Sequence, residues 1–189
     1  EGIVGGSRVD FETAQTHSSY FYFLMVGEHR DLHSFPTRRS ADLIDYTRKI
    51  HQIFGKYPQK IIGVSSDGPD HFYQGYDFVA ASKALLEFFS KYLSVHLFEE
   101  NCTVNVIRFG PTNTESFNYI FGEEFFQYLK DNNISEDFIM KPDECGKAIF
   151  ALCSGFLDAL NGQIVTVDKG MPLKDNTLMR YQMSQKNKK

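Results

Sequence analysis

The feature that most constrains the fold is an alternation of short apolar runs and amphipathic runs from residue 44 onward. Uninterrupted apolar runs are typical of strands buried on both faces of a sheet. Runs with apolar residues at three- and four-residue steps predict helices. The strand predictions are 60–65, 104–109 and 163–167, and the helix predictions are 43–54, 78–99 and 142–153. This order predicts an α/β fold, with helices on both faces of a parallel sheet.

A parallel sheet of this kind binds ligands beyond the carboxyl ends of its strands. The loops after Ser65, Phe109 and Val167 are therefore expected to carry the chemistry. Residues 114–140 interrupt the alternation and are rich in aromatic side chains, in a chain with 18 Phe and 10 Tyr. Two interpretations fit this segment: an apolar lid over a hydrophobic substrate, or a helical packing element without a ligand role.

Charge and cysteine usage narrow the function classes. The formal net charge is −4 and the Lys and Arg residues are scattered, so no face for nucleic acid is expected. No apolar run approaches the length of a membrane span. Cys102, Cys145 and Cys153 show neither CxxC nor Cys/His metal spacing, so no metal site is expected. An odd cysteine count without a disulfide framework favours a reducing cytoplasm, with Cys145 and Cys153 as buried thiols.

Three polar residues near the end of the first predicted strand form a candidate catalytic set: Ser66, Tyr76 and Lys83. Tyr76 and Lys83 are seven residues apart, so a helix that covers both places them on one side. An ammonium group near a phenol is expected to lower the pKa of Tyr76 from its usual value of about 10. Such a phenol is a good proton donor or oxyanion stabiliser. The same residues also fit a tyrosine that anchors a loop and a lysine exposed to solvent.

Four segments in succession carry a resemblance to a known family: IIGVSSDGP, YDFVAASKALLEFFSKYLS, VNVIRFGPTNTESF and NGQIVTVDKG. In order and content they resemble the corresponding segments of the short-chain dehydrogenases/reductases, over about residues 44–170. The resemblance implies a Rossmann-like doubly wound parallel sheet, a nicotinamide cofactor and hydride transfer.

The spacing of the active pair points to one branch of that family. Most members carry Tyr-x-x-x-Lys, but the residue four before Lys83 is Val79, whereas Tyr76 makes the spacing Tyr-x6-Lys. This longer spacing resembles the enoyl-acyl-carrier-protein reductases. The loop at 110–114 is similar to their Gly-Pro-Ile-x-Thr, and Ser66 lies ten residues before Tyr76. The match is closest to the serine-bearing, NADPH-using type III enzymes.

The resemblance implies a role for each matching residue. Tyr76 is expected to hydrogen-bond the oxygen of an enoyl thioester, with Ser66 assisting, while Lys83 holds the ribose of NADPH (or NADH). The substrate would be carried on acyl carrier protein or coenzyme A. A homodimer or homotetramer is expected, since the helix of Lys83 usually packs against a partner subunit in this family. The remaining residues expected to bind the cofactor are Gly110, Pro111, Thr112 and Thr114.

The chain departs from the family pattern at its N-terminal side. Residues 5–8 read GGSR, but Val9 and Asp10 follow where the phosphate-binding loop has glycine and an apolar residue. Residues 1–189 are therefore expected to be a single incomplete domain, a partial Rossmann-like sheet without the N-terminal nucleotide-binding half. We expect such a piece to be inactive, and the full-length parent to be the oxidoreductase.

Two further segments are unusual. Residues 30–43 are interpreted either as a foreign insertion or as a polar loop broken by Pro36. His33–Leu43 differs only at Ala41 from the translation of a common sequencing-adapter oligonucleotide. After the last predicted strand, Asp168-Lys169-Gly170 replaces the usual Asp-Gly-Gly, so the lysine either alters the turn or lies on the surface.

Two rival functions remain open at this point. One is a 3-ketoacyl or carbonyl reductase of the same superfamily in which the tyrosine has shifted. The other is a catalytically inactive, reductase-like binding protein, which the absence of the phosphate-binding loop favours.

Overall fold

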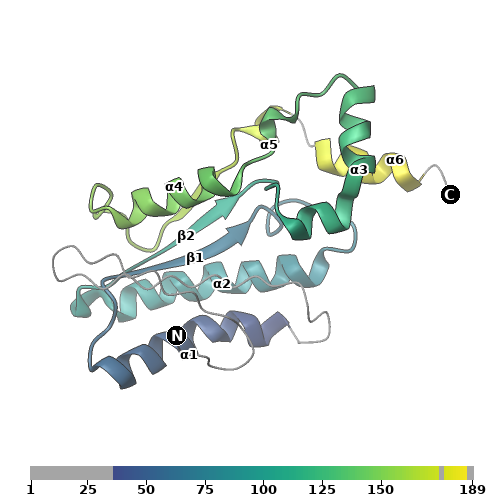
Figure 1. Cartoon of the computed structure of the whole chain (residues 1–189). Helices are drawn as coiled ribbons and strands as arrows, with labels where there is room; N and C mark the ends of the chain where they lie inside the picture. The colour runs from purple at the N-terminus through teal and green to yellow at the C-terminus, as the bar shows by residue number, and fades with distance from the viewer. Residues whose placement is uncertain (1–35, 175–176, 187–189) are drawn as a thin grey trace.

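Three parallel strands, in the order β1-β2-β3, form the sheet in the computed structural model, which describes residues 36–174 and 177–186 (Figure 1). The register pairs Ile61 with Val104 and, at the other end, Ser66 with Phe109. Both strands therefore leave the sheet at the same edge, and the predicted parallel sheet is confirmed. The strands are β1 (Lys60–Ser66), β2 (Thr103–Phe109) and β3 (Ile164–Val167).

Helices cover both faces of the sheet, as predicted (Figure 1). They are α1 (Pro36–Phe54) and α2 (Asp77–His96) on one face and α4 (Pro142–Cys153) on the other. Leu43 of α1 and Leu86 of α2 share a buried cluster with Ile61, whereas Leu152 of α4 is buried with Ile107 on the opposite side. Across residues 36–174 and 177–186, no helix combines the length and the apolar character needed to cross a membrane.

Beyond the carboxyl ends of β1 and β2 stand α3 (Glu115–Asp131) and α6 (Thr177–Lys186) (Figure 1). α3 is kinked at Gly122, whose φ of 57° suits glycine. Segment 114–140 is thus largely helical, and the lid remains a prediction. Between these elements lie the short helices η2 (Glu136–Phe138) and α5 (Met171–Lys174). Helices α3 and α6 contribute to a buried group that we call the aromatic cluster. Its members are Tyr73, Phe117, Phe125, Leu129, Ile139 and Tyr181.

Two helix boundaries differ from the sequence prediction. α1 begins at Pro36, seven residues earlier than predicted, because a proline in the first turn loses no helical hydrogen bond. Residues 36–43 are therefore helical in place of the polar loop, and a foreign origin of 30–43 stays a prediction. α2 ends at His96, and a separate 3₁₀ helix, η1 (Phe98–Glu100), follows. The GGSR segment lies outside the described residues.

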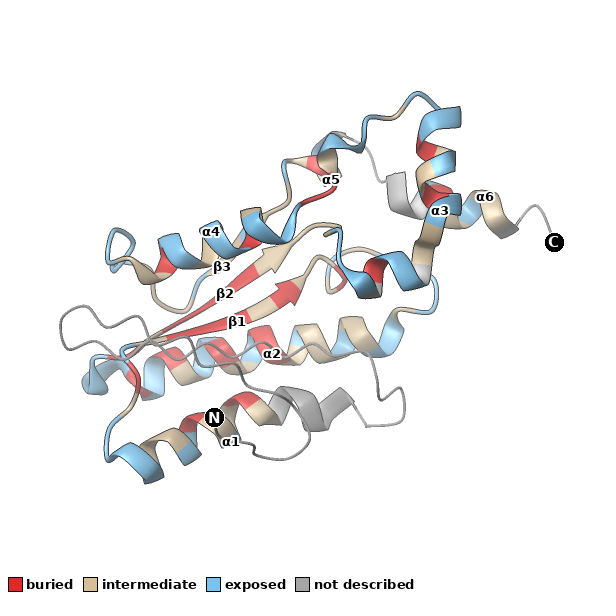
Figure 2. Cartoon of the chain, in the orientation of Figure 1, coloured by how far each residue is buried: buried red, intermediate tan, exposed pale blue. Residues whose placement is uncertain are grey.

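Buried and exposed residues alternate along α2 (Figure 2). Its buried residues are Leu86, Glu87, Ser90 and Ser94. Its outer side exposes Phe88 (51%) and Tyr92 (57%), together with Val95 (75%). Large apolar groups on the outside of a helix favour a further contact, because their exposure to water is unfavourable.

Candidate active site

Ser66 and Tyr76 meet at the carboxyl end of β1. Tyr76 lies at the N-cap of α2, and its main-chain carbonyl accepts a hydrogen bond from the Ala80 amide at 2.8 Å. The Tyr76 hydroxyl lies 3.2 Å from Ser66 Oγ. Two hydroxyls that the sequence separates by ten residues therefore form a hydrogen-bonded pair at the edge where ligands bind to such sheets.

Lys83 reaches the same edge from the second turn of α2. Its ammonium donates a hydrogen bond to the main-chain carbonyl of Val64, two residues before Ser66, at 2.9 Å. Because α2 begins directly after Tyr76, the seven-residue spacing spans about two helical turns. The predicted set of three is thus assembled around the end of β1, with direct hydroxyl contact between two members and Lys83 bonded to the strand's backbone.

The environment of Tyr76 opposes the predicted lowering of its pKa. Burial raises the pKa of the phenol, the hydrogen bond with Ser66 lowers it, and the negative charge of Asp67 raises it. Since burial dominates, the net pKa lies above the usual value, and the prediction of a lowered pKa is wrong for the structure. At neutral pH Tyr76 is therefore a protonated phenol, which can donate a hydrogen bond or a proton.

Gly68 makes room for the Tyr76 ring. A Cβ at position 68 would lie 2.7 Å from Cε1 of Tyr76, well inside van der Waals contact. Gly68→Ala must therefore displace the ring, and we expect it to lower the free energy of unfolding by about 1–3 kcal/mol in urea denaturation.

The matched control for this substitution is Gly146→Ala in α4, where an added Cβ meets no atom within 4 Å. There the higher helix propensity of alanine is expected to stabilise the protein slightly. Equal unfolding midpoints for the two variants would contradict the crowding at Gly68.

The loop after β2 holds the predicted cofactor-binding residues. It is fixed to the segment before α4, since the Met140 amide donates to Pro111 O and the Asn113 amide donates to Met140 O, both at 2.8 Å. Thr112 Oγ1 donates to Gly110 O at 2.9 Å. Gly110 follows Phe109, the register partner of Ser66, so this loop leaves the sheet beside the Ser66–Tyr76 pair.

Thr114 caps α3, where its Oγ1 accepts the Phe117 amide at 3.1 Å. Its O–H group remains able to donate to a ligand oxygen such as that of a phosphate. Together with the Lys83 ammonium, this donor set at the ends of β1 and β2 fits the ribose and phosphate of the nicotinamide half of a dinucleotide. Among residues 36–174 and 177–186, none of the glycines forms the family's G-x-x-x-G-x-G pattern.

A charged cluster that was not predicted from the sequence lies next to the candidate active site, where Ser65 precedes Ser66. Glu87 of α2, with 7% of its side chain exposed, accepts two hydrogen bonds from Arg108 and one from Ser65 Oγ, all at 2.6 Å. Arg108 also pairs with Asp70 in the loop that leads to Tyr76. A signal was present in the sequence, because an arginine within VNVIRF and a glutamate within LLEFF are charges in apolar runs.

Lys169 has a structural role in the turn after β3. Its φ of 58° is left-handed, as suits the glycine that it replaces. Its ammonium pairs with Glu144 Oε2 at 2.9 Å and donates to Asp137 O at 3.0 Å. The lysine thus connects the turn both to α4, through Glu144, and to the segment before α4, which contacts the 110–114 loop.

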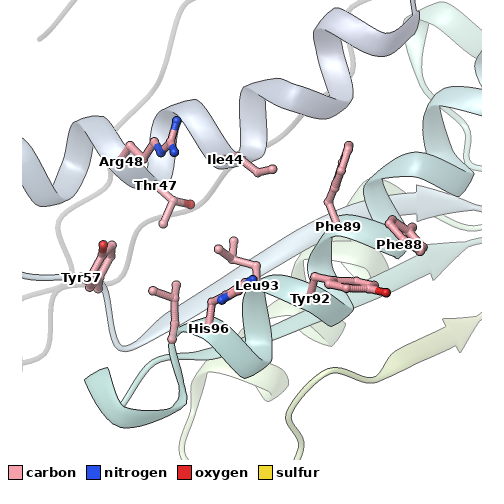
Figure 3. A pocket seen from close by; sticks show the side chains of 10 residues that line it. Ile44, Thr47, Arg48, Tyr57, Phe88, Phe89, Tyr92, Leu93 and His96 are labelled. Atoms are coloured by element: carbon pink, nitrogen blue, oxygen red, sulfur yellow. The ribbon is translucent and has the colours of Figure 1, made fainter.

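A cavity of about 510 Å³ lies elsewhere, between α1 and α2 (Figure 3). Ile44 and Thr47 from α1 face Phe89 and Leu93 from α2 across it, and Tyr92 lies at its side. Ser66, Tyr76 and Lys83 are not among its lining residues. The candidate active site is therefore defined by the strand ends and not by this cavity.

The chain is similar to one protein family and to several proteins of known structure. A family model described as enoyl-(acyl carrier protein) reductase matches residues 41–172. A 7 alpha-hydroxysteroid dehydrogenase solved with NADH and 7-oxo glycochenodeoxycholic acid is 20% identical, with a TM-score of 0.58 over 71% of this chain and 55% of that chain. An NADH-dependent enoyl-[acyl-carrier-protein] reductase from Aquifex aeolicus VF5 is 23% identical, with a TM-score of 0.52 over 69% of this chain and 47% of that chain.

A third solved structure, 4-hydroxyisoleucine dehydrogenase with NADH, is 20% identical and has a TM-score of 0.56 over 66% of this chain and 52% of that chain. Likeness at these identities establishes the shared fold. The chain spans about half the length of the solved proteins that it matches.

Proposed function

We propose, because this chain belongs to the enoyl-(acyl carrier protein) reductase family of the short-chain dehydrogenases/reductases, that the protein is an NADPH-dependent reductase of enoyl thioesters. The observation that carries this proposal is the hydroxyl pair of Ser66 and Tyr76, 3.2 Å apart at the carboxyl end of β1, with Lys83 bonded to the same strand end. Such a pair suits an oxygen that gains negative charge during a reaction.

The chemistry assigned to the chain's residues follows from their protonation and placement. When bound, a reduced nicotinamide would supply the hydride for the β-carbon of the enoyl thioester, and a proton from water would complete the reduction at the α-carbon. Tyr76, a protonated phenol, donates its hydrogen bond to the thioester oxygen and stabilises the negative charge that develops there. Ser66 supports the same oxygen, since its hydroxyl already lies beside that of Tyr76. Lys83 places a positive charge at the strand end, where it would hold the ribose of the cofactor.

The choice of an enoyl thioester over a ketone rests on two sequence features: the Tyr-x6-Lys spacing and the 110–114 loop. The test is spectrophotometry of the full-length protein with NADPH and, in separate reactions, crotonyl and acetoacetyl thioesters. Faster oxidation of NADPH with the crotonyl thioester is expected. Preference for the acetoacetyl thioester would establish the ketoacyl reductase in its place.

The aromatic cluster supports an acyl chain as the substrate's body. The helices α3 and α6, which contribute to it, stand beyond the carboxyl ends of β1 and β2 (Figure 1). Tyr76 packs against the cluster. We infer that α3 and α6 cover the acyl group of a carrier-protein or coenzyme A thioester. Longer acyl chains are then expected to lower KM.

An inactive, NADPH-independent binding protein is the second candidate. The sequence feature in its favour is that Val9 and Asp10 follow the GGSR residues 5–8, where the family's phosphate-binding loop has glycine and an apolar residue. Fluorescence titration of the full-length protein with NADPH and NADH separates the candidates. Saturable binding, stronger for NADPH, is expected for the reductase, and no binding of either would support the inactive protein.

We infer that a second copy of the chain covers the outer face of α2. The observation behind this inference is that the outer face of the helix exposes three large apolar side chains, those of Phe88, Tyr92 and Val95. A symmetric contact between two such aromatic stripes would remove both from water.

Tyr92→Glu is expected to convert this assembly to monomers, because a carboxylate cannot be desolvated in an apolar contact without a partner. Sedimentation equilibrium measures the change. Phe150→Glu is the control, since Phe150 is also exposed (73%) but lies on α4, on the opposite face of the sheet. A wild-type protein that is monomeric at high concentration would contradict the inferred assembly.

The cysteines support a cytoplasmic protein. Cys102, Cys145 and Cys153 are free thiols, and burial raises the pKa of each, to about 12 for Cys102. Cys145 is buried as predicted, whereas Cys153 is half-buried. Protonated thiols of this kind are unreactive and suit a reducing compartment.

A further inference from the structure

Two tyrosine hydroxyls bind to two consecutive residues at the end of β1. The Tyr76 hydroxyl pairs with Ser66, and the Tyr73 hydroxyl donates to Asp67 Oδ2 at 2.5 Å. A turn connects the two tyrosines, since the Tyr76 amide donates to Tyr73 O at 3.1 Å. Two side-chain hydrogen bonds, Ser66–Tyr76 and Asp67–Tyr73, therefore connect the start of the 67–76 loop to its end.

Both the hydroxyl and the ring of Tyr73 make contacts that fix its position. Its ring belongs to the aromatic cluster and is 9% exposed, between the loop and the helices α3 and α6. The same ring meets the Tyr76 ring edge to face, with centroids 6.0 Å apart. The Tyr76 ring also lies close to Gly68, where an added Cβ would be 2.7 Å from its Cε1. Contacts with Tyr73 and with the backbone at Gly68 thus both restrict where the Tyr76 ring can lie.

We propose that Asp67 and Tyr73 are positioning residues that hold the Tyr76 phenol against Ser66. This inference rests on the proposed function of Tyr76, and it adds two residues that make no contact with the reacting atoms. Asp67 anchors the Tyr73 hydroxyl, and Tyr73 in turn limits where the Tyr76 ring can lie.

The charge of Asp67 also acts on Tyr76. It raises the pKa of the phenol, against the lowering effect of the Ser66 hydrogen bond. Removal of this charge is therefore expected to lower the pKa of Tyr76, whereas removal of the Tyr73 hydroxyl leaves the charge in place. The titratable and charged groups on the elements around Tyr76 include Asp67, Asp70, His71 and Tyr73 of the loop, Asp77 and Lys83 of α2, and Tyr181 of α6.

The first experiment follows Tyr76 directly, without any need for activity. The 189-residue chain is labelled with ¹³Cζ-tyrosine, and its NMR signals are titrated with pH, with Tyr76→Phe identifying the signal. We expect Tyr73→Phe and Asp67→Ala to shift and broaden the Tyr76 signal. Asp67→Asn, which keeps an acceptor for the Tyr73 hydroxyl but loses the charge, is expected to keep the signal's place and to lower its pKa.

The second experiment measures turnover in the full-length protein. Tyr73→Phe and Asp67→Ala are expected to lower kcat about tenfold, the effect of one lost hydrogen bond to a charged group, with KM for NADPH unchanged. Asp67→Asn is expected to restore most of the kcat. Tyr46→Phe, which removes a phenol oxygen from α1, is the matched control with wild-type kcat.

The outcomes distinguish the positioning role of Asp67 and Tyr73 from the proposed function of Tyr76. An unchanged Tyr76 signal and pKa in Tyr73→Phe and in Asp67→Ala would overturn the positioning role, whatever the enzyme's activity. Wild-type turnover in Tyr76→Phe would instead overturn the proposed function. In that case the NMR titration would still decide whether Asp67 and Tyr73 hold Tyr76 in place.

Discussion

Tyr76→Phe is expected to lower the kcat for an enoyl thioester by roughly 10²–10³-fold, the usual effect of removing one donor to a developing oxyanion. The substitution removes only the hydroxyl that lies 3.2 Å from Ser66 Oγ, and the ring can keep its place beside Gly68 and Tyr73. The loss should therefore appear in kcat, with the affinity for NADPH unchanged in a fluorescence titration.

The pH dependence provides a second check on the same residue. Because burial raises the pKa of Tyr76, the phenol stays protonated through neutral pH. Turnover that needs the proton is therefore expected to persist through neutral pH and to fall only as the pH rises through this raised pKa. Ser66→Ala should give a smaller loss than Tyr76→Phe. Equal turnover in wild type and Tyr76→Phe would refute the assignment of Tyr76 as the hydrogen-bond donor to the thioester oxygen.

Arg108→Met is expected to lower the free energy of unfolding by about 3–5 kcal/mol, the typical cost of leaving one member of a buried ion pair without its partner. Glu87, with 7% of its side chain exposed, receives two of its hydrogen bonds from Arg108 and keeps only that from Ser65 in the variant. Methionine fills much of the vacated volume, so the loss reports the unpaired charge more than a cavity. Urea denaturation followed by circular dichroism measures it.

Two further variants make this experiment decisive. Combining Arg108→Met with Glu87→Leu replaces both charges by apolar groups and is expected to recover most of the lost stability. Lys147→Met removes one partner of an exposed pair with Asp143, whose side chains are 75% and 74% exposed, and should leave the unfolding midpoint nearly unchanged. Equal destabilisation by Arg108→Met and Lys147→Met would show that the buried pair has no special role.

The elements between 43 and 167 could be predicted because their signals are local. The run KIIGVS and the steps of Leu85, Phe89 and Leu93 depend only on which residues neighbour one another. Helix α4 begins and ends where the sequence predicted, since Pro142 and the acidic residues after it favour a first turn. The early start of α1 was not predicted because Pro36 was interpreted as breaking a polar loop, whereas it occupies the first turn of the helix. The kink at Gly122 was not predicted either, since the aromatic pattern of residues 114–140 does not reveal it.

The sequence by itself determined the order of strands and helices and the presence of Ser66, Tyr76 and Lys83 at one end of the sheet. The tertiary structure alone decided the protonation of Tyr76. A pKa depends on burial and on charges that are distant in sequence, and the lowered pKa predicted for Tyr76 was wrong because the folded loop buries the phenol beside Asp67. The partners of Glu87 and Tyr73 likewise follow from packing between elements, which no spacing rule along the chain describes.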